Sequence, residues 1–200
     1  MFNTLPYQQS FINDPAPHKI LVHARRVGGT FAGLALAREY VARGQRVLWI
    51  GPHGLRGVDC DPASMPREIK IVDYNLDEIR GHAAHVIMDS PNCYHGEDWH
   101  SIWNMVSWHV TTPTLARPTG YGMTVITNLD HLVLKTIDEH SNRDWSTHVI
   151  PIHDAIKDGF PNVDLTSLTE RTLRKEYMAG FNVPNEGKFK AVYDYAKTWA

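Results

Sequence analysis

The clearest chemical signal in the chain lies at residues 20–30, which read ILVHARRVGGT. An apolar run leads into a loop with two glycines, and the loop opens into an alanine- and leucine-rich segment typical of a helix. Phosphate-binding loops follow the pattern G-x-x-x-x-G-K-[ST], in which backbone N–H groups cradle phosphate and the lysine reaches the β- and γ-phosphates. Here His23 stands at the first glycine of the pattern and Gly28 at the second. Gly29 replaces the lysine, and Thr30 supplies the metal-binding hydroxyl, so the pattern predicts a phosphate-binding loop without its main charge.

Two further apolar runs end in polar side chains that suit the same chemistry. Residues 85–88 are followed by Asp89, as in the strand whose aspartate helps to hold Mg²⁺ in many ATPases. The next residue in many of those ATPases is a water-activating glutamate, and here it is Ser90. A later apolar run leads to Thr127 and Asn128. Because open α/β sheets bind ligands at the carboxyl ends of their strands, the three segments together predict a nucleotide site.

Short apolar runs alternate with helix-compatible segments along the whole chain. Strands are expected near residues 19–23, 46–50, 69–72, 84–88, 122–126 and, more weakly, 149–152. Helices are expected over residues 30–44 and 99–110, and residues 164–181 and 188–199 are charged and helix-compatible. Residues 1–18 are expected to be a lead-in, and residues 51–68 a loop. This alternation predicts an α/β fold of the P-loop NTPase type, a mostly parallel sheet flanked by helices.

The bulk composition excludes several classes of protein. Two hundred residues with 42% hydrophobic content suit one α/β domain. The net charge of −2 provides no global basic field for nucleic-acid binding. Cys60 and Cys93 supply no disulfide framework, and no apolar run is long enough to span a membrane. We therefore expect a soluble protein of the cytoplasm that has no membrane partner.

Two other groups of residues have both a functional and an ordinary interpretation. One cysteine and four histidines could bind zinc: Cys93, His82, His85, His95 and His100. Their spacing matches no closed four-ligand pattern, so hydrogen-bonded histidines are the favoured interpretation. Three tryptophans could stack on bases: Trp99, Trp103 and Trp108. No stripe of lysine and arginine accompanies them, which favours packing in the core.

With these motifs in this order, the chain resembles the large subunit of viral terminases, the motors that package DNA into procapsids. The similarity runs, with gaps, over nearly all of the sequence. Its main segments are Pro6-Tyr7-Gln8 in the lead-in, residues 24–28 in the loop, residues 80–89, Thr127-Asn128, and residues 153–181. The resemblance implies an ATPase core over residues 1–152 and a linker or small helical C-terminal extension over 153–200. It also implies that the strands ending at Asp89 and Thr127 flank the strand that leads into the loop.

The resemblance implies a role for each candidate site residue. Gln8 would contact adenine, and Thr30 with Asp89 would hold Mg²⁺. Thr127 and Asn128 would couple the nucleotide state to movement. Arg26 and Asp89 would be the catalytic groups. The nucleotide-binding residues would be Gln8, His23, Ala24, Arg25, Arg26, Val27, Gly28, Gly29 and Thr30, and the cofactors of a functional site would be ATP and Mg²⁺.

Several departures from the family pattern bear on activity. The lysine is absent, although some family members move a basic residue to the loop's start, where His23 stands, and Arg26 remains as a phosphate contact. Ser90 takes the place of the catalytic glutamate, and the nearest acids are Glu97 and Asp98. Residues 52–69 form a shorter segment than in the family. The chain ends where the family continues into a nuclease, so no nuclease activity is expected.

Two functions from different classes follow from these observations. The first is a terminase-like ATPase domain of viral DNA packaging with impaired ATP hydrolysis. The second is a non-enzymatic binding or regulatory module derived from a terminase by degeneration of its motifs. A small nucleotide kinase would need a lysine and an arginine-rich lid, which the sequence lacks. The implied partners are other terminase or packaging components, the portal or double-stranded DNA in the host cytoplasm, and the oligomeric state stays open. If the loop keeps its shape, Gly29→Lys with Ser90→Glu is expected to raise nucleotide affinity or turnover.

Overall fold

The computed structural model describes residues 4–51, 65–91, 99–110, 120–129, 131–140, 144–161, 164–173 and 177. Six strands within them form one sheet, in the spatial order β3-β2-β4-β5-β1-β6. The strands are β1 His18–His23, β2 Val47–Ile50, β3 Ile69–Val72, β4 His85–Asp89, β5 Met123–Thr127 and β6 Ser146–Ile150. Every neighbouring pair in this sheet is parallel. The predicted P-loop NTPase-like α/β architecture is therefore confirmed.

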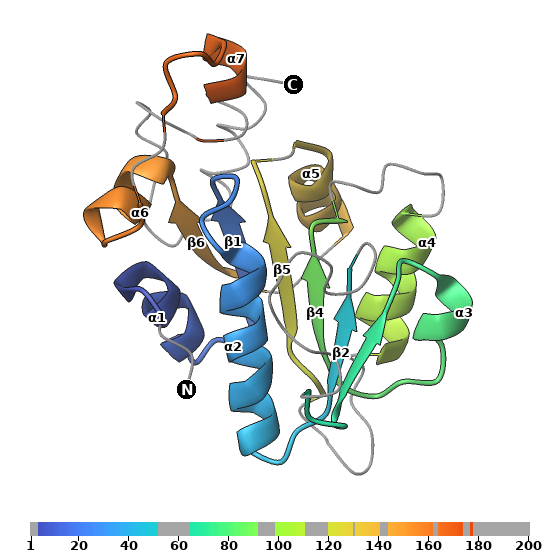
Figure 1. Ribbon diagram of the computed structural model, residues 1–200. Helices are drawn as coiled ribbons and strands as arrows, with labels where there is room; N and C mark the ends of the chain where they lie inside the picture. Colours follow the sequence, from blue (N-terminus) through green and yellow to red (C-terminus); the bar gives the residue numbers. More distant parts are fainter. Residues whose placement is uncertain are drawn as a thin grey trace.

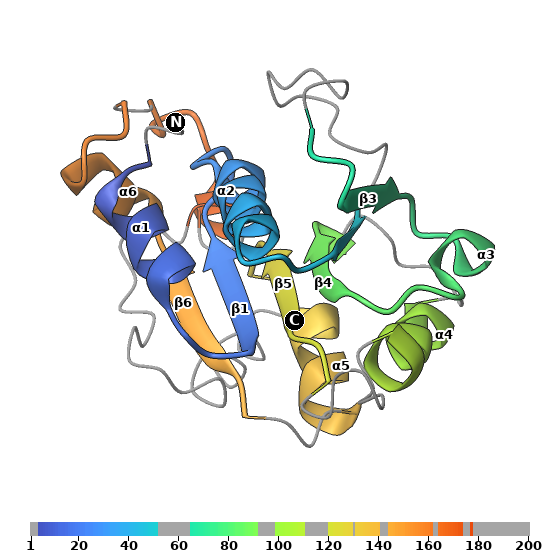
Figure 2. The ribbon, with the colours of Figure 1, turned by 90° about the horizontal axis from the view of Figure 1, so that it is seen from below.

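Helices cover both faces of the sheet, as Figures 1 and 2 show. Two helices, α1 Pro6–Asn13 and α2 Gly29–Ala42, lie on one face. On the other face lie α4 Trp99–Asn104, which continues as the π-helix η3 Met105–Val110, and α5 His131–His140. Shorter helices are α3 Leu76–Ile79, α6 Ile152–Lys157 and α7 Glu170–Thr172. None of the helices in the described ranges combines the length and apolar character that a membrane crossing requires.

The apolar run at the start of the phosphate-binding motif forms the strand that the sequence predicts. Ile20, Leu21 and Val22 are fully buried in β1, as expected for a strand of a parallel sheet that is covered on both faces. Gly28 has φ +79° and caps α2, which begins at Gly29. A left-handed backbone of this kind favours glycine. Strand, loop and helix thus follow one another as the sequence predicts.

The neighbours of β1 differ in part from the arrangement that the family resemblance implied. β5, which ends at Thr127, does pair with β1. β4, which ends at Asp89, pairs with β5 and β2 but not with β1. The expectation that the Asp89 strand flanks β1 was therefore wrong. A crossover connection can place a parallel strand next to any earlier strand, and the order of motifs along the chain does not encode that choice.

Other expectations hold in outline, with shifted boundaries or additional elements. The weak strand expected at 149–152 is β6, and the helix expected at 99–110 is α4 with η3. The expected lead-in contains α1, which the periodicity did not reveal. Of the two late helix-compatible segments, 188–199 lies outside the described residues, and only α7 is described as a helix in 164–173. The boundary proposed after residue 152 falls inside α6, which buries Ile152 and Ala155 in the core, and the division into core and extension stays a prediction.

The histidines and tryptophans that the structure describes support the ordinary interpretation. His85 stacks on Tyr40 with ring centroids 4.4 Å apart, and its Nδ1 accepts a hydrogen bond from the Gly122 N–H. Trp103 is buried and stacks on Trp145. Among the described residues, no three His, Cys, Asp or Glu side chains gather to hold a metal ion. The side chains of Cys93, His95, His100, Trp99 and Trp108 lie outside the described part.

The contact between α2 and the sheet leaves no space for a side chain at Gly33. A Cβ there would lie 2.4 Å from Ile126 Cδ1 and 2.9 Å from Trp49 Cη2, both in the core. In an exposed helix, alanine in place of glycine would stabilise by about 0.5–1 kcal/mol. Here we expect Gly33→Ala to lower the free energy of unfolding in urea by about 1–3 kcal/mol, because overpacking outweighs helix propensity. An unchanged or higher stability would contradict this close packing.

Candidate functional site

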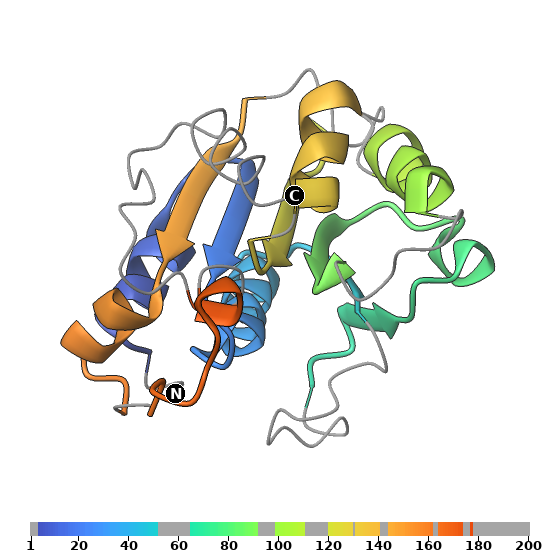
Figure 3. The ribbon, with the colours of Figure 1, turned by 90° about the horizontal axis from the view of Figure 1, so that it is seen from above.

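The loop between β1 and α2 lies at the edge of the sheet where the strands end, seen from above in Figure 3. Hydrogen bonds fix the start of the loop: the Ala24 N–H donates to the carbonyl of Ile150 in β6 at 2.8 Å, and Nδ2 of Asn128, which follows β5, donates to the carbonyl of His23 at the end of β1 at 2.9 Å. Arg25 and Arg26 are exposed. Arg26 has φ +65°, a left-handed backbone that is uncommon for a residue other than glycine. Such strained positions concentrate at binding and catalytic sites.

The hydroxyl of Thr30 and the carboxyl group of Asp89 meet in this site. Thr30 Oγ1 donates a hydrogen bond to Asp89 Oδ2 at 2.8 Å, although 59 residues separate the two in sequence. Ser90 Oγ donates to Asp89 Oδ1 at 3.1 Å, and the hydroxyl of Tyr74 donates to the Asp89 backbone carbonyl at 2.9 Å. Thr30 stands in the first turn of α2, and Asp89 ends β4. Side chains from two motifs therefore come close enough to share one hydrated cation.

Burial controls the charge of Asp89. The side chain is 6% exposed, and burial raises its pKa to about 6, while the hydrogen bonds from Thr30 and Ser90 act in the opposite direction. A buried carboxylate is stabilised by a cation placed beside it. Mg²⁺ takes oxygen ligands and commonly uses one or two carboxylates, with phosphates and water completing its shell. One carboxylate beside one hydroxyl thus fits a nucleotide-bound Mg²⁺.

The imidazole of His23 occupies the place of a side chain at Gly29. A Cβ on Gly29 would lie 2.3 Å from His23 Nε2, so any residue larger than glycine would have to displace the His23 ring. His23 Nδ1 lies 2.7 Å from the Ala24 carbonyl oxygen and must donate to it, so Nε2 of the neutral ring carries the lone pair. Burial lowers the pKa of His23, which keeps the ring neutral at pH 7.

This contact changes the expected outcome of repairing the motif. The sequence predicts that Gly29→Lys with Ser90→Glu raises nucleotide affinity or turnover if the loop keeps its shape, and a glycine with positive φ would resist the lysine. The left-handed glycine is Gly28, whereas Gly29 begins α2. The obstacle is the His23 ring, which lysine at position 29 would have to displace at a cost in stability unless His23 also changes.

Two side chains of α1 fasten the far end of the loop. The hydroxyl of Tyr7 donates to the Val27 carbonyl at 2.6 Å. Gln8 is buried, its Nε2 lies 3.4 Å and 3.3 Å from the carbonyl oxygens of Val27 and Gly28, and its Oε1 accepts from the Leu5 N–H at 2.9 Å. Contact of Gln8 with adenine stays a prediction, and in this structure the amide holds the loop instead.

The structure thus brings the predicted loop, Asp89, Thr127 and Asn128 to one edge of the sheet. Thr127 is fully buried and pairs with Val22 of β1, and its coupling role stays a prediction, like that of Asn128. Sequence reasoning missed Tyr74, which supports the Asp89 carbonyl, because nothing in the spacing of residues 72–76 indicates that contact. It also assigned no separate role to Tyr7.

Comparison with known proteins bears on the fold. No protein-family model matches the chain, and no curated protein sequence matches it. Among solved structures, the chain is similar to the large terminase ATPase domain of Thermus phage P74-26, with a TM-score of 0.53 and 13% sequence identity. The match covers 88% of this chain and 93% of that domain. The chain therefore has the fold of a phage large-terminase ATPase domain, as its motifs led us to expect.

Proposed function

We propose that this chain is a terminase-type nucleotide-binding domain that binds ATP with Mg²⁺ and hydrolyses it slowly. The observation that supports this most directly is the hydrogen bond between Thr30 Oγ1 and Asp89 Oδ2 at 2.8 Å. This bond joins the hydroxyl of Thr30, which lies in the first turn of α2, to the carboxylate of Asp89, which ends β4. The N-terminal end of α2 favours anions, and exposed Arg26 adds a cation to it.

Thr30 and Asp89 would hold the Mg²⁺ of the bound nucleotide, and the loop backbone would bind its phosphates. When bound, the ion would neutralise charge on the β- and γ-phosphates. The chain's own contribution is to orient the phosphates through the loop and to keep Asp89 out of bulk water. We place this activity with the DNA-packaging machinery in the cytoplasm of a host cell, where packaging components, the portal or DNA would be its partners.

Thr30→Val tests this site with little change in shape. The variant loses the hydroxyl but keeps the volume of the side chain, so we expect the affinity for ATP with Mg²⁺ to fall by roughly three- to tenfold in isothermal titration. Thr166→Val is the matched control, because Thr166 is exposed and its hydroxyl bonds Asp164, remote in sequence from the loop. Equal affinities of the two variants would contradict the role of Thr30.

Hydrolysis by the isolated chain should be slow, below about 1 s⁻¹, the lower end of the usual enzyme range. Gly29 offers no charge to the γ-phosphate, and Ser90 is no base at neutral pH. Glu97 and Asp98, the nearest following acids in the sequence, lie outside the described residues. We expect Arg26→Ala to lower any residual turnover at least tenfold, because a charge-assisted contact to phosphate is lost. Phosphate release at a normal enzymatic rate would contradict the impaired site.

The second candidate function is a non-enzymatic module that keeps the fold without turnover. The position of the His23 ring against Gly29 favours it, because a neutral side chain fills the space that a lysine would use. Nucleotide binding without phosphate release would support a binding module. If the chain binds neither ATP nor ADP at millimolar concentration, its function does not involve these nucleotides.

A further inference from the structure

The peptide group between Asp89 and Ser90 is held from both sides. Its N–H, from Ser90, donates to the carbonyl of Ile126 in β5 at 2.8 Å, and its carbonyl, from Asp89, accepts from the hydroxyl of Tyr74 at 2.9 Å. Ser90 has φ +52°, a left-handed backbone that is uncommon for a residue other than glycine. Such a conformation persists where the surrounding contacts fix it. The two hydrogen bonds on one peptide group are contacts of this kind.

Tyr74 reaches the Asp89 carbonyl across the end of β2. The sheet places β2 between β3, which precedes Tyr74, and β4, which Asp89 ends. Gly51 directly follows β2, and its N–H donates to the Val72 carbonyl of β3 at 3.2 Å. The hydroxyl of Tyr74 therefore supplies the donor for Asp89. A Cβ on Gly51 would lie 3.6 Å from the Asp89 carbonyl oxygen, so glycine keeps bulk away from the acceptor.

The ring of Tyr74 is itself held in place. Tyr74 is 4% exposed, and its N–H donates to Asp73 Oδ1 at 2.8 Å. The next residue, Asn75, caps α3 with a side chain that accepts from the Asp77 N–H at 3.0 Å. Because both the ring and the turn that carries it are fixed, the hydroxyl can set the direction of the carbonyl that it binds.

The direction of this peptide group affects both contacts of the Asp89 carboxylate. Thr30 Oγ1 donates to Oδ2 at 2.8 Å, and Ser90 Oγ donates to Oδ1 at 3.1 Å. Rotation of the peptide would carry the Ser90 hydroxyl away from Oδ1 and loosen the end of β4, from which the carboxylate extends toward Thr30.

We infer that Tyr74 is a positioning residue of the proposed cation site, whose hydroxyl fixes the Asp89–Ser90 peptide and so orients the Asp89 carboxylate toward Thr30 and the cation. Tyr74 acts through the backbone of Asp89. The step from Thr30 to the cation rests on the proposed function, whereas the orientation toward Thr30 does not.

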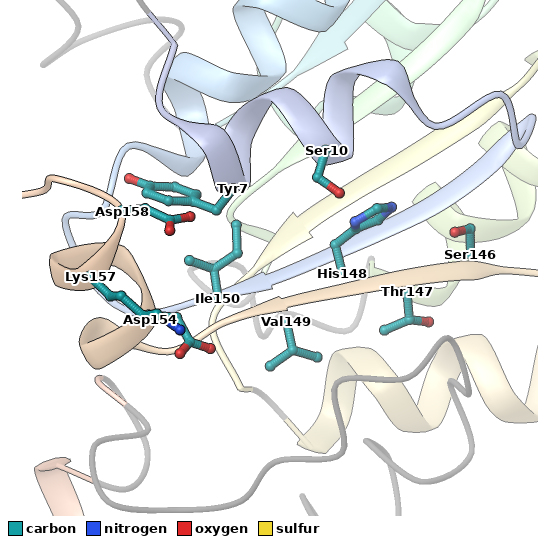
Figure 4. A pocket seen from close by; sticks show the side chains of 10 residues that line it. All are labelled: Tyr7, Ser10, Ser146, Thr147, His148, Val149, Ile150, Asp154, Lys157 and Asp158. Atoms are coloured by element: carbon teal, nitrogen blue, oxygen red, sulfur yellow. The ribbon is translucent and has the colours of Figure 1, made fainter.

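A second tyrosine hydroxyl acts on the other motif and offers a matched contrast. Tyr7 lines a groove of about 570 Å³ along β6 (Figure 4), and its hydroxyl donates to the Val27 carbonyl at 2.6 Å. Each tyrosine thus holds one backbone carbonyl, Tyr7 in the phosphate-binding loop and Tyr74 at the candidate metal ligand. Phenylalanine at either position keeps the ring and removes the hydroxyl.

ATP titrations with Mg²⁺ and with EDTA separate the two roles. In Tyr74→Phe, the gain in ATP affinity that Mg²⁺ provides should fall roughly three- to tenfold, while the affinity for metal-free ATP stays unchanged. Tyr7→Phe should lower both affinities alike, because it loosens the loop that binds the phosphates. Equal losses in both buffers for Tyr74→Phe, or no loss in either, would overturn the inference. A native chain that binds no ATP in either buffer would instead contradict the proposed function.

A double-mutant cycle in urea tests the orientation of Asp89 without any nucleotide. Thr30→Val should raise the unfolding equilibrium constant about fivefold in the native chain and less than about twofold in Tyr74→Phe, because the carboxylate no longer faces Thr30. The control is Tyr40→Phe, since Tyr40 is buried on α2 and stacks on His85; the full effect of Thr30→Val should persist there. If Tyr74→Phe does not fold, the same cycle is run in the Ser90→Gly background, where the left-handed turn costs less. Additive effects of Thr30→Val and Tyr74→Phe would make Tyr74 an ordinary core residue.

Discussion

Replacing His23 by glycine and Gly29 by lysine together is expected to raise nucleotide affinity by about 10- to 150-fold over the native chain. Residues 23–30 would then read Gly-Ala-Arg-Arg-Val-Gly-Lys-Thr, which satisfies the phosphate-binding pattern at every defined position. A lysine contact to phosphate in a partly desolvated cradle contributes about 1.5–3 kcal/mol, which corresponds to this gain. Removal of the His23 ring opens the space that the lysine needs, because that ring lies 2.3 Å from the Cβ position of Gly29.

The single variants should behave differently from the pair. Gly29→Lys alone forces its Cβ into the buried imidazole, and overpacking of this kind lowers the free energy of unfolding by about 1–3 kcal/mol. His23→Gly alone leaves a cavity and adds no charge, so nucleotide affinity should not rise. Titration of ATP with Mg²⁺ and urea denaturation of all four chains give a double-mutant cycle, which isolates the coupling between the two positions. Additive effects of the two substitutions would contradict the contact.

The same experiment separates the two candidate functions. A gain in affinity would mean that the loop still has the shape of a phosphate cradle. The residues at positions 23 and 29 would then account for the weak nucleotide binding of the native chain. No gain in a folded double variant would mean that the cradle has closed around α1, where Tyr7 and Gln8 hold the carbonyl of Val27. The binding or regulatory module would then be the better description.

The strands around the loop could be predicted because their burial leaves a direct trace in the sequence. β1, β2 and β4 are internal strands of a parallel sheet covered on both faces, so each appears as a short apolar run. Thr30 and Asp89 could be predicted as partners because each follows such a run in a recognisable motif. Their meeting at 2.8 Å follows from the parallel sheet, which brings all carboxyl ends to one edge.

The remaining features depend on tertiary contacts that leave no local trace. α1 has eight residues and only two buried apolar side chains, Phe11 and Ile12, so docking rather than periodicity stabilises it. The position of β5 between β1 and β4 depends on a crossover. In the sequence, histidine in place of the first glycine of the motif and glycine in place of its lysine appear as two separate departures. Only the structure shows that they are related, because the His23 ring fills the space that a side chain at position 29 would use.

Asp89→Asn is expected to stabilise the metal-free chain at pH 7.5 by about 1–3 kcal/mol. Burial raises the pKa of Asp89 to about 6 from its ordinary value of 3.8. Below pH 3.8 the group is protonated in both the folded and unfolded chains, so it has no effect on stability. Between the two pKa values only the unfolded chain releases the proton, and stability falls as pH rises through this window. Above pH 6 the loss is constant at about 3 kcal/mol, because each pKa unit corresponds to about 1.36 kcal/mol.

Asp89→Asn is therefore expected to be more stable than the native chain but to lose the cation site, and two measurements test these two effects. In urea denaturation without Mg²⁺, the free energy of unfolding of Asp89→Asn should exceed that of the native chain at pH 7.5, and the difference should nearly vanish at pH 4. For the exposed control Asp77→Asn, the difference from the native chain should not change with pH in this way. With ATP and Mg²⁺ at pH 7.5, the melting temperature of the native chain should rise and that of Asp89→Asn should not, because the cation loses its carboxylate. A variant less stable than the native chain at pH 7.5 would mean that the ionised Asp89 stabilises the fold. Burial of the Asp89 charge between Thr30 and Ser90 would then carry no cost in stability that cation binding has to explain. The expected result would mean instead that the fold tolerates this charge because a cation binds beside it.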